Sequence, residues 1–575
     1  MILPALICLF LHLANADDIP WWKSNVLYQV YPRSFADSDG DGNGDIKGII
    51  QHVQYLHDIG IGTIWLSPIY ASPWKDMGYD ISDYRQVNPL YGTVADVEAL
   101  IKEIHKFGMK IFLDLVPNHT SDEHPWFNAS RYKVDGKDDY YVWKDPKGWD
   151  GSKPLPPSNW MSIFGGSAWT YDDVRKQFYL HQFGSYQPDL NYRNKQVVNE
   201  MQQVMKFWFD KGLDGFRVDA IPYYVEDAEF RDEERKPNCH LPLEADCLIH
   251  NYTENLPETY EVMREFDDFL KQYDGTENPK YFFLEAYATL EQTVKYNMPH
   301  SSAFNFEVIQ KFHKDNNATE LKSIIDAYMA ILPNETWPNW VVGNHDNSRI
   351  GSKLGPELVD GFNMMILMLP GASVTYYGEE IGMLDTYVRP SRLVDDTGRD
   401  PERTPMQWSN KKNAGFSNAS TTWLPVNPNY YKINVEDELK TENSHLNKYK
   451  RLVEVRKNFI GSKDLVTATF GDWVFAFKRK NGNHEYYVII NFNDIEESVD
   501  LKSQFDKIPG TLYVHTPSQN ALYNVGDKVD TSAKLTIHPR SALGLSAASS
   551  TSLTVSLGII IGTLWLFIFS NRNFS

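Results

Sequence analysis

Several acidic side chains of this sequence stand at the ends of short apolar runs, where carboxylates can act as acids, bases or nucleophiles. In "GFRVDA", Arg217 and Asp219 flank Val218 inside a segment whose composition predicts burial. Burying an unpaired charge is costly, so two opposite charges in such a segment indicate a pair with a function. Glu285 closes the run "KYFFLE", and Asp346 follows "NWVVGNH". Three carboxylates brought together around an arginine would suit acid–base and covalent catalysis.

The runs that carry these residues alternate with amphipathic segments. Eight β-rich runs follow residue 25, and helical patterns such as "VADVEALIKEIHKFG" separate most of them. This alternation predicts an α/β fold with a (β/α)8 TIM barrel, in which catalytic groups gather at the carboxyl ends of the strands. One carboxylate alone would more simply be a capped or salt-bridged strand end. Several of them at matching strand ends favour an active site.

Composition changes mark two further domains, one inserted within the barrel sequence and one after it. Residues 120–190 are rich in Trp, Pro, Gly and Asp and predict a small inserted domain after strand 3, which leaves 17–119 and 191–470 for the barrel. Residues 471–545 alternate apolar and polar side chains and predict a C-terminal antiparallel β-domain.

Both ends of the chain resemble targeting segments. Residues 1–16 indicate a signal peptide that ends on Ala14-Asn15-Ala16. Residues 546–575 join small residues to an apolar tail, which fits a cleaved lipid-anchor (GPI) signal or, alternatively, a single membrane-spanning helix. Either anchor would hold the protein on the outer face of the plasma membrane.

The composition is compatible with secretion and excludes a nucleic-acid partner. The net charge of −20 provides no basic patch for a phosphate backbone. Cys239 and Cys247 are the two cysteines outside the signal peptide, and their closeness in a secreted chain predicts a local disulfide. Glycosylation sequons also support secretion. They begin at Asn128, Asn251, Asn317, Asn334 and Asn418. Asn118 also begins a sequon, but we expect it to be buried.

Four of the segments at strand ends resemble one enzyme family. "DLVPNH", "GFRVDA", "FLEAY" and "VVGNHD" resemble the signature segments of the α-amylase family, glycoside hydrolase family 13. "QPDLN" is similar to the extra segment of its oligo-1,6-glucosidase and α-glucosidase branch, and "RTPMQW" and the opening "WWKSNVLYQVYPRSF" resemble insect maltases. The resemblance runs from about residue 20 to 545, with every signature in order.

This resemblance implies a retaining α-glucosidase (maltase) with a defined set of site residues. Asp219 would be the nucleophile, Glu285 the general acid and base, and Asp346 a stabiliser of the transition state. The implied substrate-binding residues are Asp76, Tyr79, His119, Arg217, His345 and Arg403. Arg403 would join Asp76 to close the far wall of a pocket, so that one terminal glucose is removed at a time.

The residue after the nucleophile bears on linkage preference. In the branch that this chain resembles, α-1,6 enzymes often carry Val there, whereas this chain carries Ala220. The resemblance therefore implies α-1,4 substrates: maltose, short oligosaccharides and also sucrose.

The segment "DSDGDGNGD" has the spacing of a calcium-binding loop. Its side-chain oxygens belong to Asp37, Asp39, Asp41, Asn43 and Asp45, with Gly42 at the sixth position. The twelfth position is Gly48 instead of Glu, so one bidentate ligand of a full EF-hand is missing. A solvated acidic turn is the alternative. The resemblance adds Mg²⁺ to Ca²⁺ as a candidate ion, with a structural role.

Two other classes of function remain open at this point. Family members that escort amino-acid transporters are non-enzymatic, but they carry an N-terminal membrane helix and lack the catalytic carboxylates. Sucrose isomerases and glucosyl transferases share the catalytic residues. They differ in whether water or another sugar reaches the glucosyl-enzyme intermediate first. Some mosquito midgut maltases also serve as docking sites for a bacterial toxin, a role that no residue here reveals. The sequence leaves a homodimer as open as a monomer.

Overall fold

The computed structural model describes residues 19–239, 241 and 243–547. The predicted signal peptide at 1–16 and most of the predicted anchor segment at 546–575 therefore lie outside the described residues. None of the helices in the described part of the chain has both the length and the apolar character needed to cross a membrane.

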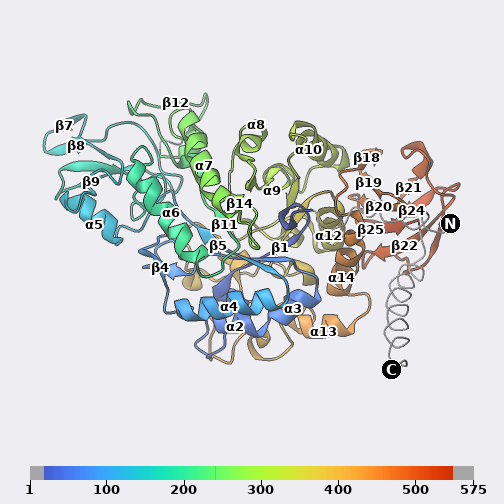
Figure 1. Ribbon diagram of the computed structural model, residues 1–575. Helices are drawn as coiled ribbons and strands as arrows, with labels where there is room; N and C mark the ends of the chain where they lie inside the picture. Colours follow the sequence, from blue (N-terminus) through green and yellow to red (C-terminus); the bar gives the residue numbers. More distant parts are fainter. Residues whose placement is uncertain (1–18, 240, 242, 548–575) are drawn as a thin grey trace, which may run out of the picture.

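Eight parallel strands form the centre of the molecule and confirm the predicted barrel (Figure 1). Each predicted run contains one of these strands, because Val, Ile, Leu and aromatic residues are buried on both faces of a parallel sheet. In chain order they are β1 (Val26–Val30), β2 (Thr63–Leu66), β5 (Lys110–Leu115), β11 (Gly215–Val218), β14 (Tyr281–Leu284), β15 (Ser301–Ala303), β16 (Asn339–Val341) and β17 (Ala372–Tyr376). Their order in the sheet is β15-β14-β11-β5-β2-β1-β17-β16.

A side chain joins the two edges of this sheet. Asn339, the first residue of β16, donates from Nδ2 to the carbonyl oxygen of Ala303 in β15 at 2.7 Å. Its Oδ1 accepts the N–H of Asn305 at 2.8 Å. These two bonds replace a backbone ladder between β15 and β16 and bring the carboxyl ends of all eight strands to one face.

Helices cover the barrel on its outside. α4 (Val94–Lys106) begins at a Thr93 capping box and buries Val97, Leu100, Ile101 and Ile104 on one face, as the 3.6-residue period predicts. The other helices are α1 (Pro32–Phe35), α2 (Ile46–Gln51), α3 (Val53–Asp58), α5 (Pro125–Tyr132), α6 (Lys195–Phe209), α7 (Pro257–Leu270), α8 (Leu290–Thr293), α9 (Glu307–Lys311), α10 (Ala318–Ile331), α11 (Ile350–Leu354), α12 (Val359–Met368), α13 (Val435–Lys440) and α14 (His445–Arg456).

The long connection after β5 contains α5 and small antiparallel sheets, which lie at one end of the molecule in Figure 1. Its strands are β6 (Trp143–Lys144), β7 (Gly148–Asp150), β8 (Lys153–Leu155), β9 (Trp169–Asp172) and β10 (Gln177–Leu180). The segment "QPDLN" returns this connection to the barrel, since Asp189 pairs with His119 in an isolated bridge. Residues of the insertion are thereby placed above the carboxyl ends of the strands.

A six-stranded antiparallel sheet lies at the opposite end (Figure 1), in the order β18-β19-β20-β25-β22-β23. Its strands are β18 (Leu465–Phe470), β19 (Val474–Asn481), β20 (His484–Asn491), β22 (Thr511–Pro517), β23 (Lys528–Asp530) and β25 (Ala542–Ser546). The sheet begins at Leu465, before the predicted boundary at 471, because β18 pairs with β19 from Leu465 to Phe470. It ends at Ser546.

The cysteine prediction is confirmed by a disulfide between Cys239 and Cys247. The asparagines at 128, 251, 334 and 418 are exposed, and Asn317 is half-buried while it caps α10. Asn118 is buried, as expected. Glycosylation at the five accessible asparagines stays a prediction.

Candidate active site

Asp219 and Glu285 lie at the carboxyl ends of two neighbouring strands. β11 and β14 pair in parallel with Val218 opposite Leu284, so the next residue of each strand carries a carboxylate at the same level. The predicted contact between Arg217 and Asp219 is present, through Nη1. The same guanidinium reaches Glu285 Oε1 from Nη2 at 2.7 Å. One cation therefore holds both carboxylates on one side of the site.

The backbone after β11 fixes the second oxygen of Glu285. Ala220 adopts a left-handed conformation, with φ of 52°, and donates its N–H to Glu285 Oε2 at 2.9 Å. A non-glycine residue in this conformation is uncommon and is found mostly where the surrounding structure imposes it. Ala220 thus orients Glu285 while its own small side chain faces the cavity.

The carboxyl group of Glu285 is close enough to affect the titration of Asp219. Burial, together with the neighbouring charge of Glu285, raises the pKa of Asp219 well above its usual range, although Arg217 opposes the shift. A negative charge on Asp219 is therefore disfavoured by burial and by repulsion, and Arg217 is the group that compensates it.

Asp346 has the opposite electrostatic environment. Its Oδ1 lies 3.1 Å from Arg399 Nη1 and 2.9 Å from Arg403 Nη2. Burial disfavours its charge, but the guanidinium groups of Arg399 and Arg403 lower its pKa well below the usual range. Asp346 is therefore anionic, which suits the stabilisation of a positively charged transition state.

The far wall of the site differs from the prediction in one residue. Arg399 pairs with Asp76, from Nη2 to Oδ1 at 2.8 Å, and Asp395 holds Arg399 at 2.8 Å. The prediction that Arg403 joins Asp76 is wrong. Arg403 is fully buried behind Asp346, where its Nε donates to the carbonyl oxygen of His345 at 2.6 Å.

Local backbone geometry explains why Arg399, and not Arg403, pairs with Asp76. Arg403 is the last residue of the short 3₁₀ helix Asp400–Arg403 and is buried, whereas Arg399 precedes this helix and lines the cavity. The segment "TGRDPER" contains both arginines, but the sequence analysis named only Arg403.

Tyr79, His119 and His345 lie in the floor and side of the site. The rings of Tyr79 and His345 are stacked, with centroids 5.3 Å apart, and Tyr79 Oη lies 2.6 Å from His345 Nε2. Burial lowers the pKa of His119 to about 3 and that of His345 well below its usual range. Both imidazoles are therefore neutral near pH 7 and can exchange hydrogen bonds with hydroxyl groups.

These residues line one cavity of about 550 Å³. A cavity of this size accommodates a small organic ligand, and the pair Asp76–Arg399 belongs to its lining. Its lining comprises Asp76, Tyr79, His119, Ile163, Phe164, Phe183, Asp219, Ala220, Pro222, Tyr223, Glu244, Glu285, Tyr287, His345, Asp346, Asp396, Thr397 and Arg399. The prediction missed the aromatic side chains from the insertion and from loops, because no strand end or short motif marks them.

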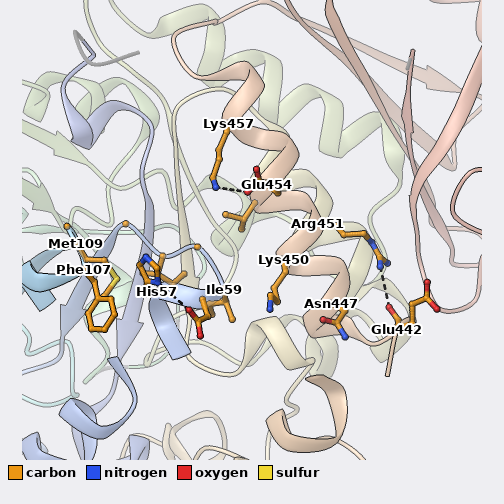
Figure 2. Close-up of a pocket in the computed structure, with 16 residues that line it drawn as sticks. His57, Ile59, Phe107, Met109, Glu442, Asn447, Lys450, Arg451, Glu454 and Lys457 are labelled. Atoms are coloured by element: carbon orange, nitrogen blue, oxygen red, sulfur yellow. Dashed lines mark hydrogen bonds and ion pairs between the residues drawn. The ribbon is translucent and has the colours of Figure 1, made fainter. Parts of the chain in front are cut away.

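A second cavity, of about 750 Å³, lies between the end of α3, the turn before β5 and α14 (Figure 2). It borders Gly62 and Met109, which precede β2 and β5, so it opens at the amino ends of the strands. Its charged residues are partly neutralised within the cavity, as in the pair Lys457–Glu454. No predicted site residue lines it, and we place the chemistry in the first cavity.

The acidic loop fits a divalent cation with fewer ligands than predicted. Asp37, Asp39 and Asp45 each present a carboxylate oxygen, and these atoms lie within 4.8 Å of one another. Such oxygen donors suit Ca²⁺ or Mg²⁺. The structure does not bring the other two predicted ligands into this cluster. Asp41 accepts the N–H of Asn43 at 2.7 Å, and the Asn43 oxygen is 2.8 Å from the Arg33 guanidinium, which satisfies it.

The position of Arg399 in the cavity wall leads to a testable prediction, with Arg389 as the control. For the maltase activity that the sequence resemblance implies, we expect Arg399→Gln to lower kcat/KM for maltose by roughly 10²–10³-fold, mainly through KM, because it leaves the buried carboxylate of Asp76 unpaired. Arg389→Gln removes an exposed arginine of the same loop and should leave both constants unchanged. A normal KM in Arg399→Gln, as measured by steady-state kinetics, would exclude Arg399 from the substrate wall.

The chain is similar to carbohydrate-active enzymes over most of its length. The family model "Alpha amylase, catalytic domain" matches residues 29–463. An "Alpha-glucosidase" of Apis mellifera is 43% identical over 502 residues, which covers 85% of this chain and 88% of the relative. An "Alpha-glucosidase" of Culex pipiens is 40% identical and covers 97% of each chain. The crystal structure of Bacillus licheniformis trehalose-6-phosphate hydrolase matches with a TM-score of 0.79 at 31% identity, covering 92% of this chain and 100% of that one.

Proposed function

This chain belongs to the alpha-amylase family, and from that membership we propose that it is an α-glucosidase that removes terminal α-1,4-linked glucose from maltose and short oligosaccharides with retention of configuration. The observation that carries the proposal is the guanidinium of Arg217, which contacts both Asp219 and Glu285, two carboxylates that line one cavity. α-Glucosidases among its relatives support the same activity.

The reaction proceeds in two steps. Asp219 attacks the anomeric carbon while Glu285 donates its proton to the departing glycosidic oxygen, which yields a glucosyl ester on Asp219. Glu285, now ionised, takes a proton from water, and that water displaces Asp219. Asp346 stabilises the positive charge that develops on the sugar ring in both transition states.

The wall formed by Asp76 and Arg399 supports release of one glucose at a time. The ion pair blocks the cavity beyond the sugar that is attacked, so an internal bond of a long chain cannot enter. Ala220 lines the cavity beside the scissile bond and leaves room for an α-1,4-linked partner. We include sucrose among the substrates, because its glucose carries the same α configuration.

The three carboxylates argue against a purely non-enzymatic role, since a transporter partner or receptor has no use for them at one site. Transfer of glucose to a second sugar uses the same intermediate, and products distinguish it from hydrolysis.

Incubation of the purified protein with maltose, isomaltose and sucrose, followed by NMR, tests the proposal. We expect the glucose released from sucrose to appear first as the α-anomer, and maltose to be cleaved faster than isomaltose. First release of β-glucose from sucrose, whose other product is fructose, would exclude the retaining mechanism, and faster cleavage of isomaltose would exclude the proposed linkage preference. Accumulation of a rearranged disaccharide or of longer oligosaccharides would identify an isomerase or a transferase.

We also propose that the enzyme acts at the outer cell surface. The support is the sequence of residues 1–16 and 546–575, together with the Cys239–Cys247 disulfide, which suits an oxidising compartment. Release of activity from membranes by a phosphatidylinositol-specific phospholipase would distinguish a lipid anchor from a membrane-spanning helix.

We propose that Asp37, Asp39 and Asp45 hold a structural Ca²⁺ or Mg²⁺, which would stiffen the loop between α1 and α2. Chelation should lower the thermal midpoint by roughly 2–5 °C, because an ion that binds only the folded state stabilises it. Asp39→Asn should abolish this shift, whereas Asp58→Asn, an exposed aspartate at the end of α3, should retain it. Equal midpoints of the native protein with and without chelator would remove the site.

A further inference from the structure

Two carboxylates at the mouth of the active-site cavity have no part in the chemistry described above. Glu244 and Asp396 both line the cavity, and both are exposed, whereas Asp219 and Glu285 are buried at its base. Within the described part of the chain, neither Glu244 nor Asp396 has an ion pair or a side-chain hydrogen bond. Resting on the proposed glucosidase activity, we infer that these two residues contact the leaving-group sugar and make the enzyme select against leaving groups that carry negative charge.

The backbone of Glu244 is held at the mouth from two sides. Three residues later, Cys247 is joined to Cys239 by the disulfide. One residue earlier, the carbonyl oxygen of Leu243 accepts the N–H of Gly166 from the inserted domain at 2.8 Å. Ile163 and Phe164 of that same insertion line the cavity. The disulfide-linked segment and the insertion thus form one side of the mouth together.

Asp396 is held on another part of the rim by the turn that positions Arg399. Asp395, the preceding residue, accepts the N–H of Arg399 at 2.8 Å and the hydroxyl of Thr397 at 2.7 Å. These bonds fix the backbone on both sides of Asp396 and leave its own carboxylate free to accept hydrogen bonds from a ligand.

The charges around the cavity are strongly unequal. Six carboxylates belong to its described lining, but only one guanidinium, that of Arg399. Arg399 is already paired with Asp76, Asp346 and Asp395 at 2.8–3.1 Å. Its charge is therefore compensated and cannot attract an anion at the mouth.

Hydroxyl groups of a neutral sugar can donate to Glu244 and Asp396, whereas a carboxylate or phosphate on the leaving group meets two like charges. Exposed charges a few ångströms apart alter binding by roughly three- to tenfold each. The fold itself is compatible with charged substrates, because the matching hydrolase is named for trehalose 6-phosphate. The residues at the mouth of the cavity must therefore determine whether a negatively charged leaving group is accepted.

Maltitol and maltobionate provide a matched pair of substrates. Both carry the same terminal glucose on the same α-1,4 bond to an open-chain leaving group, and only maltobionate is negatively charged. The measurement is the ratio of kcat/KM for maltobionate to that for maltitol, at low and at high ionic strength.

We expect this ratio to lie well below one for the unmodified enzyme at low salt and to rise with salt, as screening weakens the repulsion. Glu244→Gln and Asp396→Asn should each raise the ratio by roughly three- to tenfold, and the double variant should raise it further. The control is Asp246→Asn, which removes an exposed carboxylate next to the same disulfide but outside the cavity lining and should leave the ratio unchanged.

An unchanged ratio in both single variants, with maltose still hydrolysed, would overturn this inference and leave the proposed function intact. A ratio that rises equally in Asp246→Asn would also overturn it, because the effect would then belong to the overall charge of the protein. Failure of the unmodified enzyme to hydrolyse maltose would overturn the proposed function and this inference together.

Discussion

Replacing Asp219 with Asn lowers kcat/KM for maltose by about 10⁴-fold or more, because the amide cannot form the glucosyl ester. The substitution keeps the size of the side chain, and Arg217 retains its contacts with Asp114 and Glu285. Burial already disfavours the charge on Asp219, so its removal should not weaken the fold. Steady-state rates and thermal midpoints, measured on the same preparation, check both halves of this prediction.

Glu229→Gln is a suitable control for this variant. Glu229 follows the same strand but its side chain is exposed, with a single ion-pair distance of 3.9 Å to Arg231. It should keep the full rate. If Asp219→Asn retained more than about a tenth of the normal rate, another group would have to form the first bond, and the two-step mechanism would fail.

The second large effect is expected for Glu285→Gln, and it should depend on the leaving group. Glucose leaves as a strong base and needs a proton, so cleavage of maltose should slow by roughly 10²–10⁴-fold. Nitrophenolate leaves without a proton, so the first step on 4-nitrophenyl α-glucoside should slow far less. The amide oxygen of this variant could still accept the N–H of Ala220 that orients Glu285 in the native protein.

Added azide separates the role of Glu285 from that of Asp219. With Glu285→Gln, azide should attack the glucosyl ester from the face opposite Asp219 and restore turnover of the nitrophenyl substrate as α-glucosyl azide. With Asp219→Asn, any azide product should have the β configuration, because no ester forms first. Equal losses on maltose and the nitrophenyl substrate, without rescue by azide, would show that Glu285 is not the proton donor.

The sequence by itself determined the barrel and the carboxylates at the ends of its strands, because both follow from local rules. The alternation of apolar runs and amphipathic segments defines eight strands independently of the conformation of the loops, and the structure contains all eight. A charge placed next to a buried strand is costly unless it is paired, which singled out Arg217 and Asp219. The equal level of Asp219 and Glu285 then follows from the register of neighbouring parallel strands.

Only the tertiary structure decided which arginine meets Asp76, how the sheet closes, and what stands at the mouth of the cavity. Arg399 and Arg403 are four residues apart, and a short 3₁₀ helix that starts after Arg399 and ends at Arg403 determines their directions. Asn339 closes the barrel with a side chain, which no periodicity predicts. Glu244 reaches the mouth through a disulfide and a contact with the inserted domain. In each case the side chain's direction depends on irregular backbone and on partners distant in the chain, and neither is encoded in a local pattern.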